Sequence, residues 1–368
     1  MLNGLAILAV VANHASHSGF IAMFWWTDRY QAVSVPNYDQ MGSLSYFLLI
    51  AMQKLALFSV PTFLFITGIF LAYTARGAQT HLTWKVVLRR ILNLLPPYLL
   101  WTTVFIVVQF VLGEPVTPVY VLASVFLVDY SIFFFIPLVI FYYLISPFLS
   151  PLAKNRPLLL LGLGGLVLFM GIAKSYLELY THMPGVTEST AVSGVIPFLQ
   201  SGKIFEYFFY YAAGLVAGFH QAKLKEFVAR AKWPLLAAVI VMAVLAVAEA
   251  EWVFQATELD TWRSRTLSLP TALFASTFIL TFLAFDQVKL PFSGLLYQLG
   301  VDTLGIYLVH KSVLLVLPKI VYHVLPVILG LQPIYQSVLI AIAVGIPLVL
   351  MMIMRQSPIR SHYRTVFG

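Results

Sequence analysis

The sequence predicts an all-α integral membrane protein with about ten transmembrane helices and both termini on the cytoplasmic side. Hydrophobic residues make up 61% of the 368 positions, charged residues only 10%, and the mean hydropathy is +0.91. Soluble domains usually carry about a quarter charged residues, so this chain has too few to cover a surface in water. The net charge of +8 does not indicate nucleic-acid binding, because the basic residues lie between long apolar runs rather than on one polar face.

Ten segments have the roughly 20 mostly apolar residues that a membrane helix requires. The second and the ninth are longer than a span needs, so each is expected to tilt or to break. No internal repeat and no long linker divides the chain, which predicts a single domain over residues 1–368. The expected spans are residues 2–24, 46–74, 95–112, 131–150, 157–173, 203–220, 234–249, 267–285, 294–321 and 333–354.

Basic residues set the expected orientation, because short loops rich in Lys and Arg stay on the cytoplasmic side. If the first helix runs outward, such loops alternate along the whole chain without exception. Both termini are then cytoplasmic. The 14 of 22 Lys and Arg residues assigned to the inner side are Arg76, Lys85, Arg89, Arg90, Lys154, Arg156, Lys223, Lys225, Arg230, Lys232, Lys289, Arg355, Arg360 and Arg364.

Ionisable side chains within the expected spans are candidates for function, because each costs at least a few kcal/mol at bilayer depth. Glu206 lies one helical turn from Lys203 and is expected to pair with it. Lys319 is expected to extend toward the outer surface. For Lys54, Asp302 and His310, function and internal pairing have equal weight. The full set is His14, His17, Lys54, Glu206, Asp302, His310, Lys311 and Lys319.

His14 is the strongest candidate for a catalytic residue. It lies about 20 Å into the first helix at 1.5 Å per residue, beyond the middle of a hydrocarbon core about 30 Å thick. Desolvation favours the neutral imidazole, which can accept a proton from a hydroxyl group. A satisfied polar residue between helices is the competing interpretation. His17 lies one turn further on the same face, but no carboxylate or third histidine is nearby in sequence, so no metal site is expected.

Arg89 and Arg90 form a second candidate site, at the cytoplasmic entrance of the third expected span. Taken alone, such a pair most often faces lipid phosphates. Guanidinium groups also bind phosphates through two parallel hydrogen bonds. The pair therefore raises the hypothesis of a cytosolic ligand that carries several phosphates.

Five segments, in chain order, form one pattern. The opening segment LNGLAILAVVANH (2–14) ends in His14, FLFITGIFL (63–71) contains Thr67, and two arginines precede Pro96-Pro97-Tyr98. The other two segments are FFFIPLVIFYYLISPFL (133–149) and LGVDTLGIYLVH (299–310). Together they resemble acyltransferase family 3, membrane proteins that O-acylate cell-envelope glycans. Thr67 occupies a position where the family has serine.

The resemblance implies a membrane O-acyltransferase of the inner membrane. The donor would be cytosolic acyl-CoA, acetyl-CoA by default, used as a co-substrate with no bound cofactor. The acceptor would be a hydroxyl of an envelope polysaccharide or a lipid-linked sugar. His14 would act as general base and Arg89 and Arg90 would bind the donor. The further pocket residues would be His17, Lys54, Thr67, Tyr98, Asp302 and His310.

Chemistry at such a site is expected to be a direct transfer, because the sequence contains no cysteine that could hold the acyl group. A covalent route through Ser16 or Ser18 stays open. The oxyanion needs a donor, which a Ser, Thr, Tyr or Lys of a neighbouring helix would supply.

One position departs from the family pattern. The family has an arginine eleven residues before the histidine, where this chain has Asn3. Weaker donor binding, a different donor and a takeover by Arg89 and Arg90 are all open, as is an inactive scaffold. A transporter or flippase of a glycan or small molecule is the alternative from another class, although transporters usually have repeated halves. Transfer of a succinyl rather than an acetyl group also stays open.

Overall fold

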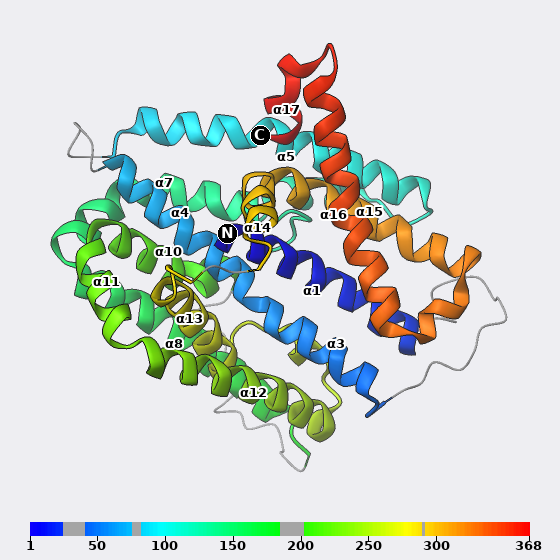
Figure 1. Cartoon of the computed structure of the whole chain (residues 1–368), viewed down its shortest axis with the longest axis horizontal. Helices are drawn as coiled ribbons and strands as arrows, with labels where there is room; N and C mark the ends of the chain where they lie inside the picture. The colour runs from blue at the N-terminus through cyan, green and yellow to red at the C-terminus, as the bar shows by residue number, and fades with distance from the viewer. Residues whose placement is uncertain (25–40, 76–81, 185–201, 289–290) are drawn as a thin grey trace. The chain divides into compact units, whose positions relative to one another are not determined.

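The described part of the computed structural model is α-helical, with turns between the helices and no strand (Figure 1). Nine of its helical stretches are long and apolar enough to cross a membrane. The expected span at 203–220 corresponds to α10, Lys203–Phe219, a helix of 17 residues. The prediction of an all-α multi-pass membrane protein is thereby confirmed. The described residues are 1–24, 41–75, 82–184, 202–288 and 291–368.

The chain divides into two compact units. Unit 1 comprises Met1–Ala56, Asn93–Phe126 and Phe292–Gly368, and unit 2 comprises Leu57–Leu92 and Leu127–Pro291. The long helix α5, Trp84–Val111, contributes its first part to unit 2 and its second part to unit 1. The single domain expected over the whole chain stays a prediction.

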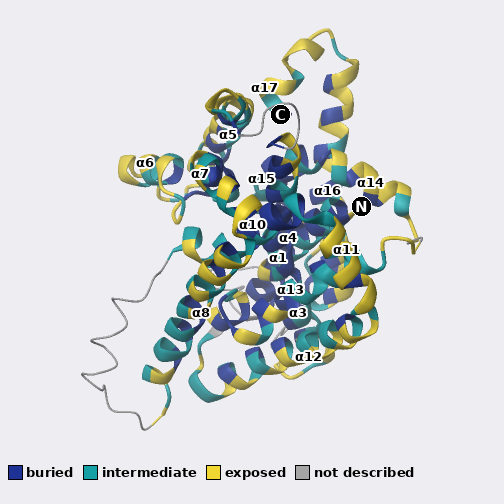
Figure 2. Cartoon of the chain, turned by 90° about the vertical axis from the view of Figure 1, so that its left-hand side faces the viewer, coloured by how far each residue is buried: buried dark blue, intermediate teal, exposed yellow. Residues whose placement is uncertain are grey.

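Unit 1 is built around α1, Leu2–Phe24, which packs against α3, α14, α15 and α16. Much of α1 is buried by these neighbours (Figure 2). The other helices of unit 1 are α3 (Leu44–Leu55), α6 (Pro118–Phe126), α14 (Ser293–Val301), α15 (Thr303–Val324), α16 (Gln332–Gln356) and α17 (Tyr363–Phe367), with 3-10 turns at Pro326–Gly330 and Arg360–His362.

In unit 2, α10 packs against α4, α7 and α8, and α12 packs against α13. The helices of unit 2 besides α10 are α4 (Ser59–Ala75), α7 (Phe135–Asn155), α8 (Pro157–Thr181), α11 (Gln221–Arg230), α12 (Lys232–Thr257) and α13 (Leu269–Ala284), with a 3-10 turn at Asp260–Ser264.

Both spans that were expected to tilt or break are broken. The second consists of α3 and α4 joined by a 3-10 turn at Ala56–Phe58. Pro61 explains the position of this break, because its ring clashes with the carbonyl four residues earlier and it has no N–H to donate. The ninth span is interrupted at Asp302, which separates α14 from α15.

The third span begins at Trp84 rather than near residue 95, so Arg89 and Arg90 lie inside α5. Charged residues hid this part of the helix from a hydropathy pattern, because they are unfavourable in lipid but do not interrupt helical hydrogen bonding. The helix continues through Pro96 and Pro97.

Glycines at both ends of α1 allow its neighbours to approach closely. A Cβ on Gly4 would lie 2.0 Å from the backbone oxygen of Leu296 in α14. A Cβ on Gly19 would lie 2.4 Å from Nε2 of Gln336 in α16 and 2.7 Å from a methyl carbon of Leu49 in α3. A side chain at Gly4 would push α1 away from the backbone of α14, whereas one at Gly19 would require the side chains of Gln336 and Leu49 to move.

We therefore expect Gly4→Ala to destabilise the protein by about 1–3 kcal/mol or more, because a backbone atom cannot move aside as a flexible side chain can. Thermal unfolding in detergent measures the effect. Gly162→Ala in α8 is the matched control, since nothing lies within 4 Å of its added Cβ, and it is expected to leave the unfolding temperature unchanged or slightly raised. Equal behaviour of the two variants would contradict the packing argument.

The orientation of the helices stays a prediction, and reporter fusions test it. A reporter fused after Lys232, at the start of α12, or after Gly368 is expected to report the cytoplasm, because basic residues cluster before each position. A reporter near Glu258, just after α12, is expected to report the outer side. A C-terminal reporter on the outer side would overturn the orientation. Arg76 and Lys289, two of the residues behind this expectation, lie outside the described residues.

Candidate functional site

A cavity of about 180 Å³ lies in unit 1 between α1, α15 and the second part of α5. The lining positions on α1 follow the i, i+3, i+4, i+7 spacing of one helix face, and those on α15 do the same. Two helix stripes therefore face each other across the cavity, with Phe105 of α5 beside them. The lining residues are His14, His17, Ser18 and Ile21 of α1, and Lys311, Leu314, Leu315, Pro318 and Lys319 of α15.

His14 reaches this cavity with a partly exposed side chain. Its imidazole forms no hydrogen bond with any other described residue. His17, one turn further along α1, is exposed and lines the same cavity. The two histidines predicted from the first helix are thus at the cavity wall.

His310 lies beside His14 but is completely buried. The ring centroids are 5.3 Å apart and the ring planes differ by 34°. Nδ1 of His310 lies 3.0 Å from the carbonyl oxygen of Ile306. A carbonyl only accepts, so Nδ1 carries the proton and Nε2 carries a lone pair. Nε2 has no hydrogen-bond partner among the described residues, which is costly for a buried polar atom.

Two lysines of α15 line the same cavity. Lys311 follows His310 directly in sequence, and Lys319 lies two turns further along the helix. Nζ of Lys319 lies 3.6 Å from Oε1 of Glu114, and its expected extension toward the outer surface stays a prediction. The sequence did not indicate that Lys319 belongs to the site. The signal available in the sequence was the helical spacing of positions 311, 314, 315 and 318, which places them on one face of α15 together with Lys319.

Two predicted pocket residues are held by internal partners within unit 1. The hydroxyl of Tyr98 is bonded to the carbonyl oxygens of Ser124, at 3.0 Å, and Val125, at 2.8 Å. Asp302 accepts hydrogen bonds from Gln298, at 2.6 Å, and from Arg355 of α16. For Asp302 the structure thus supplies the internal pairing that was weighed against function. Neither residue lines the cavity.

Lys54 is completely buried near the end of α3 and also does not line the cavity. The residue before it, Gln53, accepts a hydrogen bond at its backbone oxygen from Nδ2 of Asn13, at 3.1 Å. This bond joins α3 to α1 at the residue preceding His14. The end of α3 thus supports the position of the histidine.

The remaining predicted residues belong to unit 2. Thr67 donates its hydroxyl proton to the carbonyl of Phe63 one turn earlier, at 2.7 Å. Arg90 donates to Oγ1 of Thr74 in α4, at 2.7 Å, and its guanidinium lies 5.7 Å from the ring centre of Tyr143 in α7. Arg89 is exposed and forms no contact of this kind with the described residues. The two adjacent arginines therefore differ in their freedom to bind a ligand.

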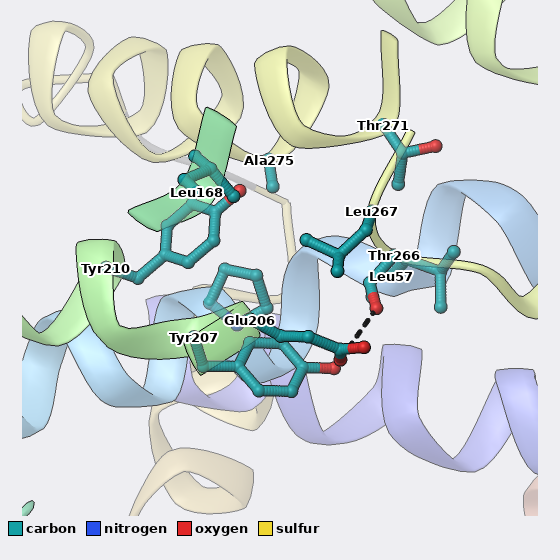
Figure 3. Close-up of a pocket in the computed structure, with 10 residues that line it drawn as sticks. Leu57, Leu168, Glu206, Tyr207, Tyr210, Thr266, Leu267, Thr271 and Ala275 are labelled. Carbon is teal, nitrogen blue, oxygen red and sulfur yellow. Dashed lines mark hydrogen bonds between the residues drawn. The ribbon is translucent and has the colours of Figure 1, made fainter. Parts of the chain in front are cut away.

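A second cavity lies in unit 2 around Glu206 (Figure 3). Its volume of about 10 Å³ has room for roughly one water molecule. Thr266 donates to the carboxylate of Glu206, at 3.3 Å, as the dashed line in Figure 3 marks. The expected pair between Glu206 and Lys203 is wrong: Nζ of Lys203 instead donates to the backbone oxygen of Asp129, at 3.0 Å. Spacing along one helix did not reveal these partners from other segments.

The comparison with protein families agrees with this architecture. The model of acyltransferase family 3, described as an acyltransferase domain, matches residues 1–352 of the 368. A search of curated proteins and a search of solved structures found no match. The family match covers all of unit 2, unit 1 up to residue 352, and every predicted site residue. The chain belongs to acyltransferase family 3 and is a multi-pass membrane acyltransferase.

Proposed function

We propose that this enzyme transfers an acyl group, acetyl by default, from cytosolic acyl-CoA to a hydroxyl of an envelope polysaccharide or a lipid-linked sugar. We place it in the inner membrane and assign His14 as the general base. The observation that carries the proposal is the position of His14 at the wall of a cavity, with no hydrogen bond from another described residue to its nitrogens. A general base needs a lone pair within reach of the proton that it removes.

The proposed reaction is a direct acyl transfer. A nitrogen of His14 takes the proton of the acceptor hydroxyl as its oxygen attacks the thioester carbonyl. The C–S bond then breaks, the acyl ester forms, and the thiolate of CoA leaves with the proton from His14. Of the two serines considered for a covalent route, Ser18 lines the cavity, whereas Ser16 is completely buried and donates to the backbone oxygen of Asn13, at 2.7 Å.

His310 is suited to position His14 in this reaction. Its Nε2 is an acceptor without a partner among the described residues, and the imidazole of His14 lies beside it, with the ring centroids 5.3 Å apart. We assign an N–H of His14 as the donor to this nitrogen when the substrate is bound. Such a bond would leave the lone pair of His14 on its other nitrogen, directed at the cavity. His310 would therefore fix the tautomer of His14 without touching the substrate, as a second group often does for a catalytic histidine.

Lys311 is the residue we assign to the developing oxyanion. It lines the cavity together with His14, and a cation there stabilises negative charge more strongly than in water, because little solvent screens it. For the phosphates of the donor we assign Arg89, on the basis of its charge and exposure. Arg90, with its guanidinium already bonded to Thr74, would contribute chiefly by holding α5 in place.

The roles of the two histidines can be separated by kinetics. Replacing His14 with Ala is expected to lower kcat about 10²–10⁴-fold, the usual contribution of a general base, with expression and thermal stability near those of the wild type. Release of CoA from acetyl-CoA in the presence of acceptor measures this. A folded His14→Ala variant that keeps its activity would make His310 the base, and a variant that fails to fold would make His14 a structural residue.

In the same experiment, replacing His310 with Ala is expected to lower kcat by less than the His14 variant does, to leave the KM for acyl-CoA unchanged, and to alter the pH dependence of kcat. The free energy of unfolding should fall by no more than the contribution of the lost ring packing. The substitution also removes a buried nitrogen without a hydrogen-bond partner among the described residues, and this offsets part of the loss. Combining the two substitutions should cost little more than His14→Ala alone, since His310 acts through His14. Additive losses would contradict a positioning role.

The two arginines are expected to respond differently to alanine. Arg89→Ala should raise the KM for acyl-CoA with little change in kcat, because phosphates remote from the reacting carbonyl contribute uniform binding. Arg90→Ala should also lower thermal stability, because it removes the bond to Thr74.

Arg89→Lys should restore the affinity for the donor only in part. Added salt should weaken donor binding less in Arg89→Ala than in the wild type. Asn3→Arg, which restores the residue of the family pattern, is expected to tighten donor binding. An unchanged KM in Arg89→Ala would show that this arginine faces lipid.

A further inference from the structure

The cavity that contains His14 has a cationic wall. The ten described residues that line it include two lysines and two histidines but no Asp or Glu. Nothing in the proposed transfer of an acetyl group to a neutral sugar uses a second cation there, since Lys311 alone is assigned to the oxyanion. Lys319 is thus a charged group at the cavity that the reaction leaves without a role. Charges at membrane depth are costly and usually mark a ligand or an ion path.

Glu114 is the carboxylate described next to Lys319, and the pair is loose. The two charged atoms lie 3.6 Å apart, whereas a charge-assisted hydrogen bond of this type is usually 2.7–2.9 Å long. The side chains are 24% and 34% exposed, respectively. A loose, partly exposed ion pair contributes little to stability. Glu114 also does not line the cavity, so Lys319 can turn to another carboxylate at little cost.

Lys319 is separated from Lys311 by eight residues of α15, or about 12 Å along the helix axis at 1.5 Å per residue. His14 and Lys311 would hold the reacting groups, so Lys319 would meet a part of the substrate several bonds away from them. A substrate group bound by Lys319 would differ between one substrate and another, but it would take no part in bond breaking. This is the arrangement of a specificity-determining contact.

We propose that the cavity accepts a substrate that carries a carboxylate, and that Lys319 binds this carboxylate by exchanging it for Glu114. The inference rests on the proposed function for the location of the reacting groups. The carboxylate has two possible sources with the same chemistry. It belongs either to the acyl group, as in succinyl-CoA, or to the acceptor, as in a uronic acid. In both cases Lys319 selects the acidic substrate over its neutral counterpart.

Two pairs of probes distinguish the sources. The donor pair is succinyl-CoA and acetyl-CoA, assayed by release of CoA. The acceptor pair is 4-nitrophenyl glucuronide and 4-nitrophenyl glucoside, assayed by mass spectrometry of the acylated product. Each probe is tested with the full-length wild type and with Lys319→Gln, Lys319→Arg and Glu114→Gln. The control is Lys174→Gln, which breaks a pair of similar separation, 3.8 Å to Glu178, in unit 2.

In one of the two pairs, Lys319→Gln is expected to lower kcat/KM for the acidic member about 10-fold or more, with the loss chiefly in KM. The neutral member should change much less. Lys319→Arg should keep most of the preference because it keeps the charge. Glu114→Gln should act in the opposite direction and favour the acidic member, since it removes the competitor for Lys319. Lys174→Gln should change neither member.

Equal losses for the acidic and neutral members of both pairs would overturn the inference. In the donor pair they would show that Lys319 binds the phosphates that all CoA esters share. A loss of thermal stability in both Lys319→Gln and Glu114→Gln, with no change in preference, would also overturn it and would make the pair structural.

A binding measurement keeps this inference separate from the proposed function. Sodium succinate and sodium glucuronate are added to the purified protein, and the unfolding temperature is compared with that in sodium chloride of equal ionic strength. Stabilisation that disappears in Lys319→Gln supports the carboxylate site even if the wild type transfers no acyl group from CoA, in which case only the proposed function fails. The absence of stabilisation by both anions, together with an absence of preference in turnover, overturns the site.

Discussion

Helix α1 can hold His14 at the wall of the cavity because glycines near both of its ends let neighbouring helices approach without a side chain between them. At Gly4 the approach is to backbone of α14, and at Gly19 it is to side chains of α3 and α16. In lipid, helices associate through close packing rather than through hydrophobic burial alone, and small residues at the contact make that packing possible. The position of the proposed base is therefore set by residues that perform no chemistry.

The membrane environment also explains why several polar side chains are bonded within the protein. Polar groups within a membrane protein must find partners inside the protein, and most of those described here do. Asp302 is bonded to Arg355, Tyr98 to two backbone carbonyls and Glu206 to Thr266. Nε2 of His310 is one of several buried side-chain atoms without a hydrogen-bond partner among the described residues, together with, for example, Thr62 Oγ1 and Glu249 Oε2. It differs from those two in lying beside His14, the residue that lines the cavity.

Residues that are adjacent in sequence separate in function once their surroundings are known. Arg89 and Arg90 form one motif, yet successive residues of a helix point about 100° apart, so only Arg90 meets α4 and α7. His310 and Lys311 divide in the same way, the first buried behind the cavity and the second at its wall. Motif spacing predicted that these pairs matter, but it could not assign different roles to their members.

The sequence by itself determined the all-α membrane class, the approximate spans, the excess length of the second and ninth of them, the family and the candidacy of His14. These follow from composition, from hydrophobic run length and from short motifs, which depend on residues close together in the chain. Only the tertiary structure decided that Lys319 lines the cavity with His14, that Glu206 bonds Thr266 rather than pairing with Lys203, and that Asp302 is held internally. The physical reason is that a polar side chain in a helix bundle is satisfied by whichever helix packs against it, and that helix is usually distant in sequence.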